Sequence, residues 1–151
     1  MDIQFGSINW LAVIVTTIVM FVIGGAWYAG VFAKAWPELH GFSQSRLDAA
    51  QGRFALNMVA ILAGDFVRAL IVVLLIQSLR IEGLGGGLQV GLLVWIGFSL
   101  TYDVGWALSS SVPIKAFAID SSYRLLCLLA AGAILASWQK SGAAGAIPAT
   151  S

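Results

Sequence analysis

Residues 54–79 read FALNMVAILAGDFVRALIVVLLIQSL, an apolar run interrupted by only two charged side chains, Asp65 and Arg68. A run of this length exceeds the roughly 20 residues that a helix needs to cross about 30 Å of hydrocarbon. Three further stretches meet the same requirement, at residues 9–30, 88–108 and 116–138. The sequence therefore predicts an all-α integral membrane protein, a bundle of four transmembrane helices joined by short loops.

The composition agrees with a membrane protein. Of the 151 residues 60% are hydrophobic and 10% are charged, whereas charged residues make up about a quarter of a soluble domain. The formal net charge of +1 offers no basic surface, so we expect no nucleic-acid partner. One cysteine and one histidine exclude an intramolecular disulfide and the usual Cys/His zinc sites. We expect neither a metal nor a cofactor, and the lipid bilayer is the first expected partner.

All four spans are assigned to one domain. We expect a single transmembrane domain over residues 1–138 and a mobile tail of small residues over 139–151. The chain starts Met1-Asp2-Ile3 and lacks the basic region of a signal peptide. We therefore expect the first span to be retained.

The three connections are predicted to be loops. They are the polar residues 33–53, the glycine-rich turn at residues 83–87 and the proline-containing residues 109–115. In the first connection, Ser45 and Asp48 have the spacing of a capping box, and Gly52 can end the short helix that follows. The composition leaves open whether this piece lies on the membrane surface or forms a solvated turn.

Small residues recur at four-residue spacing within the spans, a pattern that permits close contact between helices. The pairs are Ala60 with Gly64, Gly25 with Ala29, and Gly132 with Ala136.

Lysine and arginine near the span ends predict the orientation. Four of them, Lys34, Arg46, Arg53 and Lys115, flank the first and third connections, whereas Arg80 and Lys140 lie on the other side. Because basic residues favour the cytoplasmic side, we expect these two connections in the cytoplasm. Both termini are then non-cytoplasmic.

Five charges within the spans are the candidate site. They form a proposed intramembrane polar network of Asp65, Arg68, Asp103, Asp120 and Arg124. Each costs roughly 2.5 to 3.5 kcal/mol at a helix centre. Residues three or four apart share a helix face, which predicts ion pairs of Asp65 with Arg68 and of Asp120 with Arg124. Asp103 is then the unpaired acid, and we expect a central contact between Asp65 and Arg124.

Aromatic side chains surround the wider end of this network. The expected pocket aromatics are Trp27, Tyr28, Tyr102, Trp106 and Tyr123. An aromatic belt at the membrane surface would place most of them equally well. His40 stands beside Gly41 in a polar loop, and we expect it to be solvated rather than a ligand or a switch. We find no nucleophile beside a base, so no catalytic residue is assigned.

Several short motifs resemble one family. The motifs are Ile8-Asn9-Trp10-Leu11-Ala12-Val13, Gly24-Gly25-Ala26-Trp27-Tyr28, Lys34-Ala35-Trp36, Leu93-Val94-Trp95-Ile96-Gly97-Phe98, and Tyr123 with Gly132-Ala133-Ile134-Leu135 and Trp138. They are similar to small bacterial four-span proteins classed as domain of unknown function 1761. The resemblance implies a multi-pass protein of the bacterial inner membrane and carries over no activity. The Asp/Arg pairs are not part of the recognised pattern.

Three functions are consistent with these features. The first is a binding or transport module whose one-sided pocket takes a proton with a small cation or an amphiphile. The second is a structural or accessory subunit, as a homo-oligomer or with other membrane subunits, whose charged faces meet another chain. The third is a membrane enzyme on a lipid or isoprenoid, with an aspartic acid as general acid. A purely structural role, in which the charges fix how the helices pack, is consistent with the same features.

Overall fold

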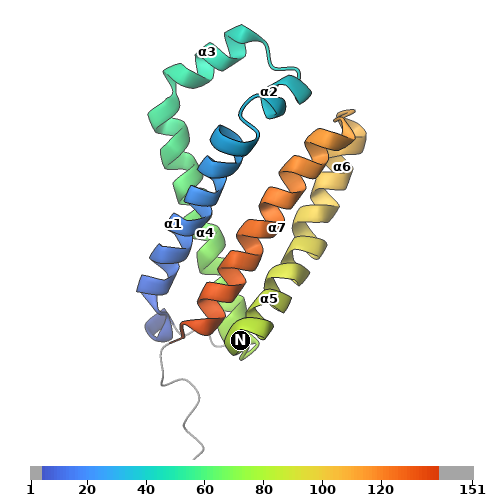
Figure 1. Ribbon diagram of the computed structural model, residues 1–151. Helices are drawn as coiled ribbons and strands as arrows, with labels where there is room; N and C mark the ends of the chain where they lie inside the picture. The colour runs from blue at the N-terminus through green and yellow to red at the C-terminus, as the bar shows by residue number, and fades with distance from the viewer. Residues whose placement is uncertain (1–4, 140–151) are drawn as a thin grey trace, which may run out of the picture.

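The structure, a computed structural model that describes residues 5–139, is a four-span helical bundle (Figure 1). The first span is α1 (Trp10–Gly25) continued by a π-helical segment, η2 (Ala26–Val31); the second is α4 (Phe54–Ser78). The third comprises α5 (Gly83–Val94), a second π-helical segment η3 (Trp95–Leu100), and α6 (Thr101–Ser109); the fourth is α7 (Ile114–Ser137). Outside the spans lie η1 (Phe5–Ser7), α2 (Ala35–Leu39) and α3 (Gln44–Gly52). All four spans are long and apolar enough to cross a membrane, which confirms the predicted fold class.

Two local predictions are wrong. The expected glycine-rich turn at residues 83–87 is the first part of α5, and the chain turns at Arg80 and at Gly83, the first residue of α5, which both have positive φ. Of these glycines, Gly87 packs against the neighbouring helix α7. In the first connection the side chain that caps α3 is Ser43, which accepts from the backbone N–H of Arg46, and not Ser45. Gly52 does end the helix, as predicted. The predicted tail lies almost wholly outside the described residues.

The closest helix contact in the bundle joins α5 to α7. A Cβ added at Gly87 would collide with the carbonyl oxygen of Gly132, and one at Gly91 with that of Leu128. Backbones can approach this closely only where side chains are missing. Gly132 therefore serves in helix contact as predicted, whereas a Cβ at Gly25 or Gly64 would meet nothing within 4 Å.

The bundle is packed at one end and splayed at the other. Ala69, Val72, Val73 and Ile76 in the second half of α4 are buried against the other spans, while the first half, from Phe54 to Gly64, is exposed or half-buried. Figure 1 shows α3 and the start of α4 leaning away from α6 and α7. The start of α4 is thus less closely packed against the other spans, and we call the α2/α3 end the open end of the bundle.

Two π-helical segments, η2 in the first span and η3 in the third, are hydrogen-bonded to α7. The indole N–H of Trp27 in η2 donates to the carbonyl oxygen of Ile119 at 3.1 Å, and that of Trp95 in η3 donates to the carbonyl oxygen of Ser121 at 3.0 Å. A π-helical turn inserts one residue into a helix and is frequent at functional sites. Both segments face the part of α7 that carries Asp120 and Arg124.

Candidate functional site

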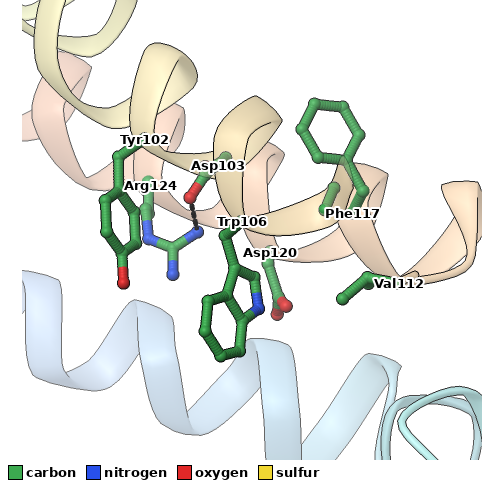
Figure 2. Close-up of a pocket in the computed structure, with 8 residues that line it drawn as sticks. Tyr102, Asp103, Trp106, Val112, Phe117, Asp120 and Arg124 are labelled. Carbon is green, nitrogen blue, oxygen red and sulfur yellow. Dashed lines mark hydrogen bonds and ion pairs between the residues drawn. The ribbon is translucent and has the colours of Figure 1, made fainter. Parts of the chain in front are cut away.

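An ion pair between α6 and α7 stands at the centre of the site. Arg124 Nη1 donates to Asp103 Oδ1 at 2.5 Å, and the side chain of Asp103 is 5% exposed while that of Arg124 is 35% exposed. Figure 2 shows the pair bridging the two helices. The expected pair of Asp120 with Arg124 and the expected unpaired Asp103 are therefore both wrong. The antiparallel neighbour α6 offers Arg124 a carboxylate that is more buried than Asp120.

Asp120 is held by three uncharged or weakly basic donors instead of an arginine. Its Oδ1 accepts from the hydroxyl of Tyr28 and from the indole N–H of Trp36, both at 2.9 Å. Its Oδ2 lies 3.0 Å from Nε2 of His40. The side chain of His40 is only 15% exposed, so the expectation of a solvated His40 is wrong. Asp120 is the acid of the network that lacks an arginine partner.

The contacts of Asp120 fold the α2 segment onto the bundle. Trp36 and His40 are four residues apart, hence on one face of α2, and their rings lie 5.1 Å apart. The ring of Phe42 continues the cluster at 5.1 Å from Trp36 and 5.4 Å from His40. Arg46 at the start of α3 lies 4.5 Å above the Phe42 ring. We call this group of Trp36, His40 and Phe42 the aromatic cap.

The second predicted ion pair is present and separate from the first. Arg68 Nη1 donates to Asp65 Oδ1 at 3.0 Å, three residues back along α4, which confirms the intrahelical pair. The side chain of Asp65 is 2% exposed and that of Arg68 is 36% exposed. The predicted contact between Asp65 and Arg124 is not formed, because each arginine binds a different carboxylate. The network is thus two ion pairs and a separate Asp120 cluster.

Two adjoining pockets lie against these groups. The first, of about 170 Å³, is lined by Tyr102, Asp103, Trp106, Ala107, Val112, Phe117, Asp120 and Arg124 (Figure 2). The second, of about 210 Å³, is lined by Arg68, Phe98, Ser99, Tyr102, Arg124 and Leu128. Tyr102 and Arg124 line both. We call the first the Trp106 pocket and the second the arginine pocket.

The five predicted aromatics divide between the pocket and its support. Tyr102 and Trp106 line the Trp106 pocket as expected. Tyr28 does not line the pocket, but its hydroxyl donates a hydrogen bond to Asp120, which does. The ring of Tyr123 packs edge-on against that of Tyr28, with the ring centroids 4.9 Å apart. Trp27 anchors η2 to α7 and lines neither pocket.

Several residues of the site were not predicted from the sequence. Trp36 and His40 are the main ones, and their four-residue spacing was the only signal that they share a face. The others are Phe98, Ser99 and Phe117, which line the pockets. For these three no local pattern distinguishes a pocket residue from a lipid-facing one.

One carboxylate oxygen in each Asp/Arg ion pair has no hydrogen-bond partner in the described part of the chain. Oδ2 of Asp65 and Oδ2 of Asp103 are both buried and accept no hydrogen bond within residues 5–139. An unsatisfied buried acceptor is costly in a low-dielectric medium. In the same part of the chain, no group of three or more His, Cys, Asp or Glu residues could hold a metal ion. The arrangement can bind a polar head group beside aromatic walls, and it displays no nucleophile with a base.

Fold and site define a multi-pass membrane protein with a polar pocket between its helices. The family model described as "Protein of unknown function (DUF1761)" matches residues 11–136, so the chain belongs to this family. No curated protein and no solved structure matches the chain.

Proposed function

We propose that the protein is a membrane-embedded binding or transport module whose polar pocket takes an amphiphile, or a proton together with a small cation. The observation that supports this proposal is the Trp106 pocket, where an ion pair and Asp120 lie beside the exposed side chains of Tyr102 and Trp106. Polar groups that fix a head group and apolar walls that take a chain are the usual features of a ligand site. Among the candidate ligands, these features favour an amphiphile.

The position of the pocket supports access from one side. Asp103 and Asp120 are each six residues from the α2/α3 end of their helix, a depth of roughly 9 Å. The helices pack tightly at the opposite end, where α5 meets α7. From the distribution of basic residues we place the open end in the cytoplasm, with both termini outside, in the inner membrane of a bacterium.

If the ligand includes a proton, the side chains assigned to exchange it are Asp120 and His40. The imidazole of His40 contacts Asp120, the intramembrane acid that has no arginine partner within residues 5–139, and the two side chains lie at a distance across which a proton can pass. Asp103, engaged by Arg124, is not assigned this role.

Native mass spectrometry of the purified protein tests amphiphile binding. We expect one retained amphiphile per chain, lost when Trp106→Ala removes a pocket wall. The matched control is Trp138→Ala, because Trp138 is also exposed and lies outside both pockets. Absence of any retained amphiphile, or equal loss in both variants, would contradict the proposal.

An accessory-subunit role is the second candidate, supported by the side chains of Arg68 and Arg124, which lie within two spans and are about one-third exposed. A carboxylate on a neighbouring transmembrane helix could meet them, since charges in lipid pair with one another. Persistent co-purification with other membrane subunits, abolished by changes at these arginines, would favour this role. A stable homo-oligomer or monomer that retains amphiphile would favour the binding module.

A further inference from the structure

The side chains of Arg68 and Arg124 line the same pocket and keep N–H donors that bind no other group of the described chain. Each guanidinium carries five N–H donors, and within the described chain each uses only Nη1, on Asp65 or on Asp103. Both side chains line the arginine pocket and are about one-third exposed, whereas their carboxylate partners are buried behind them. Among the described residues, the lining of the pocket thus includes two arginines and no carboxylate.

We propose that the arginine pocket binds the anionic head group, a carboxylate or a phosphate, of a lipid-borne amphiphile. This inference rests on the proposed binding function and specifies the ligand class. The fork of a guanidinium matches the paired oxygens of a carboxylate or phosphate, and such charge-assisted hydrogen bonds are roughly twice as strong as neutral ones. The hydroxyls of Ser99 and Tyr102, which line the pocket and have no partner within residues 5–139, add two donors of the right kind.

Exposed aromatic side chains of the third span line one side of the pocket. Phe98 is 75% exposed and Tyr102 is 65% exposed, both in the middle part of the third span. Leu128 supplies an apolar floor. A ligand with a hydrocarbon chain can enter here sideways without leaving the membrane, which favours a lipid-borne anion over a free one.

The arginines also point toward one leaflet. Helical side chains lean toward the N-terminus of their helix, and both α4 and α7 begin at the open end of the bundle. Arg124 lies ten residues into α7, roughly 15 Å from its start, and its lean brings the guanidinium closer to the interface. Head groups are drawn inward around intramembrane arginines by local thinning of the bilayer.

A second copy of the chain does not supply the anion. Asp65 and Asp103 are buried, and Asp120 is engaged by three donors of its own chain. These are the acids of the four spans, so none is free to reach into a neighbour. The acids of the spans therefore favour an anion from another molecule.

Competitive native mass spectrometry in a non-ionic detergent tests the proposal. The probes are a long-chain carboxylate, a long-chain alkyl phosphate, the amine and the alcohol with the same chain, and acetate. The test variants are the charge-neutral pair Asp65→Asn with Arg68→Gln and the pocket-filling Ser99→Leu. Arg53→Gln serves as the matched control, because Arg53 is exposed near the same end and outside both pockets.

We expect the carboxylate and the phosphate to bind at least about 10-fold more tightly than the alcohol. Both test variants should remove this preference, and the control should keep it. Tighter binding of the amine, or an anion preference that survives in both variants, would overturn the anionic assignment while amphiphile binding stands. Acetate that competes as well as the long-chain carboxylate would overturn the lipid-borne origin. Failure of every long-chain probe would refute the binding function itself.

Discussion

Replacing Asp120 by alanine should release the aromatic cap from the bundle. Asp120 accepts hydrogen bonds from Trp36 and His40 of the loop and from Tyr28 of the first span. The loop is therefore tied to α7 by two contacts with one carboxylate. Hydrogen bonds to a charged group contribute about 1.5 to 3 kcal/mol each, and we use the lower value because Asp120 is partly exposed.

Loss of the two loop contacts then costs about 3 kcal/mol, which corresponds to a roughly 100-fold shift toward the open loop. Hydrogen exchange of the protein in lipid nanodiscs measures this shift. The reporting amides are those of His40, Gly41 and Phe42, which donate to the carbonyl oxygens of Trp36, Glu38 and Pro37 at 3.1 Å. Their exchange should accelerate by about two orders of magnitude.

Two further variants sharpen this test. Asp120→Asn keeps one acceptor oxygen for Tyr28 and Trp36, so the acceleration should fall to about 10-fold. Asp48→Ala is the matched control, because Asp48 is exposed and bonds only Gln44 within α3. If these amides exchange in Asp120→Ala at the same rate as in the wild type or in Asp48→Ala, the Asp120 carboxylate does not hold the aromatic cap.

Three other outcomes are expected. Gly87→Ala should destabilise the protein in detergent by about 1 to 3 kcal/mol, because the added Cβ meets the α7 backbone. Gly85→Ala is the control: its Cβ meets nothing within 4 Å, so the change should be neutral or stabilising. Thermal unfolding measures both. Asp103→Asn or Arg124→Gln alone should cost about 3 to 5 kcal/mol and both together much less; additive losses of thermal stability would show that the two side chains do not interact. A phosphatase fused after the fourth span should be active and a fluorescent-protein fusion dark, and the reverse pattern would place the pocket on the opposite side.

The spans could be predicted because composition and length decide them. Residues 54–79 predict a membrane-spanning helix from their length and apolar composition alone, and in the structure α4 begins at Phe54 and ends at Ser78. The pair of Asp65 with Arg68 was equally predictable, since both residues belong to one helix and their spacing fixes the face.

The partner of Arg124 could not be predicted from spacing. Asp120 stands four residues before it on α7, yet the arginine binds Asp103 on α6. This choice depends on how α6 is rotated and shifted along α7, which follows from long-range packing such as the contact of Gly87 with Gly132. Helical periodicity fixes faces within one helix and says nothing about the register between two.

The role of the first connection was hidden for a different reason. Trp36 and His40 stand in a polar segment whose composition is typical of a solvated loop. Only the position of Asp120, opposite them on α7, turns the segment into a cap. The helical start of α5 was missed because glycine in sequence favours a turn, whereas here it permits close packing.

One-sided access of water to the pockets tests the central claim most directly. Cys127 is fully buried, and replacing it by alanine gives a background for single cysteines at Ser99 and Ala107, which line the pockets, and at Leu93, which is exposed on the same span outside them. A charged thiol reagent is added to one face of sealed vesicles. We predict that the cysteines at 99 and 107 react only from the α2/α3 side, and more slowly when a bound amphiphile fills the pockets, while the cysteine at 93 stays unreactive. Cysteines at 99 and 107 that are as inert as the one at 93, or that react equally from both faces, would contradict a polar pocket open on one side.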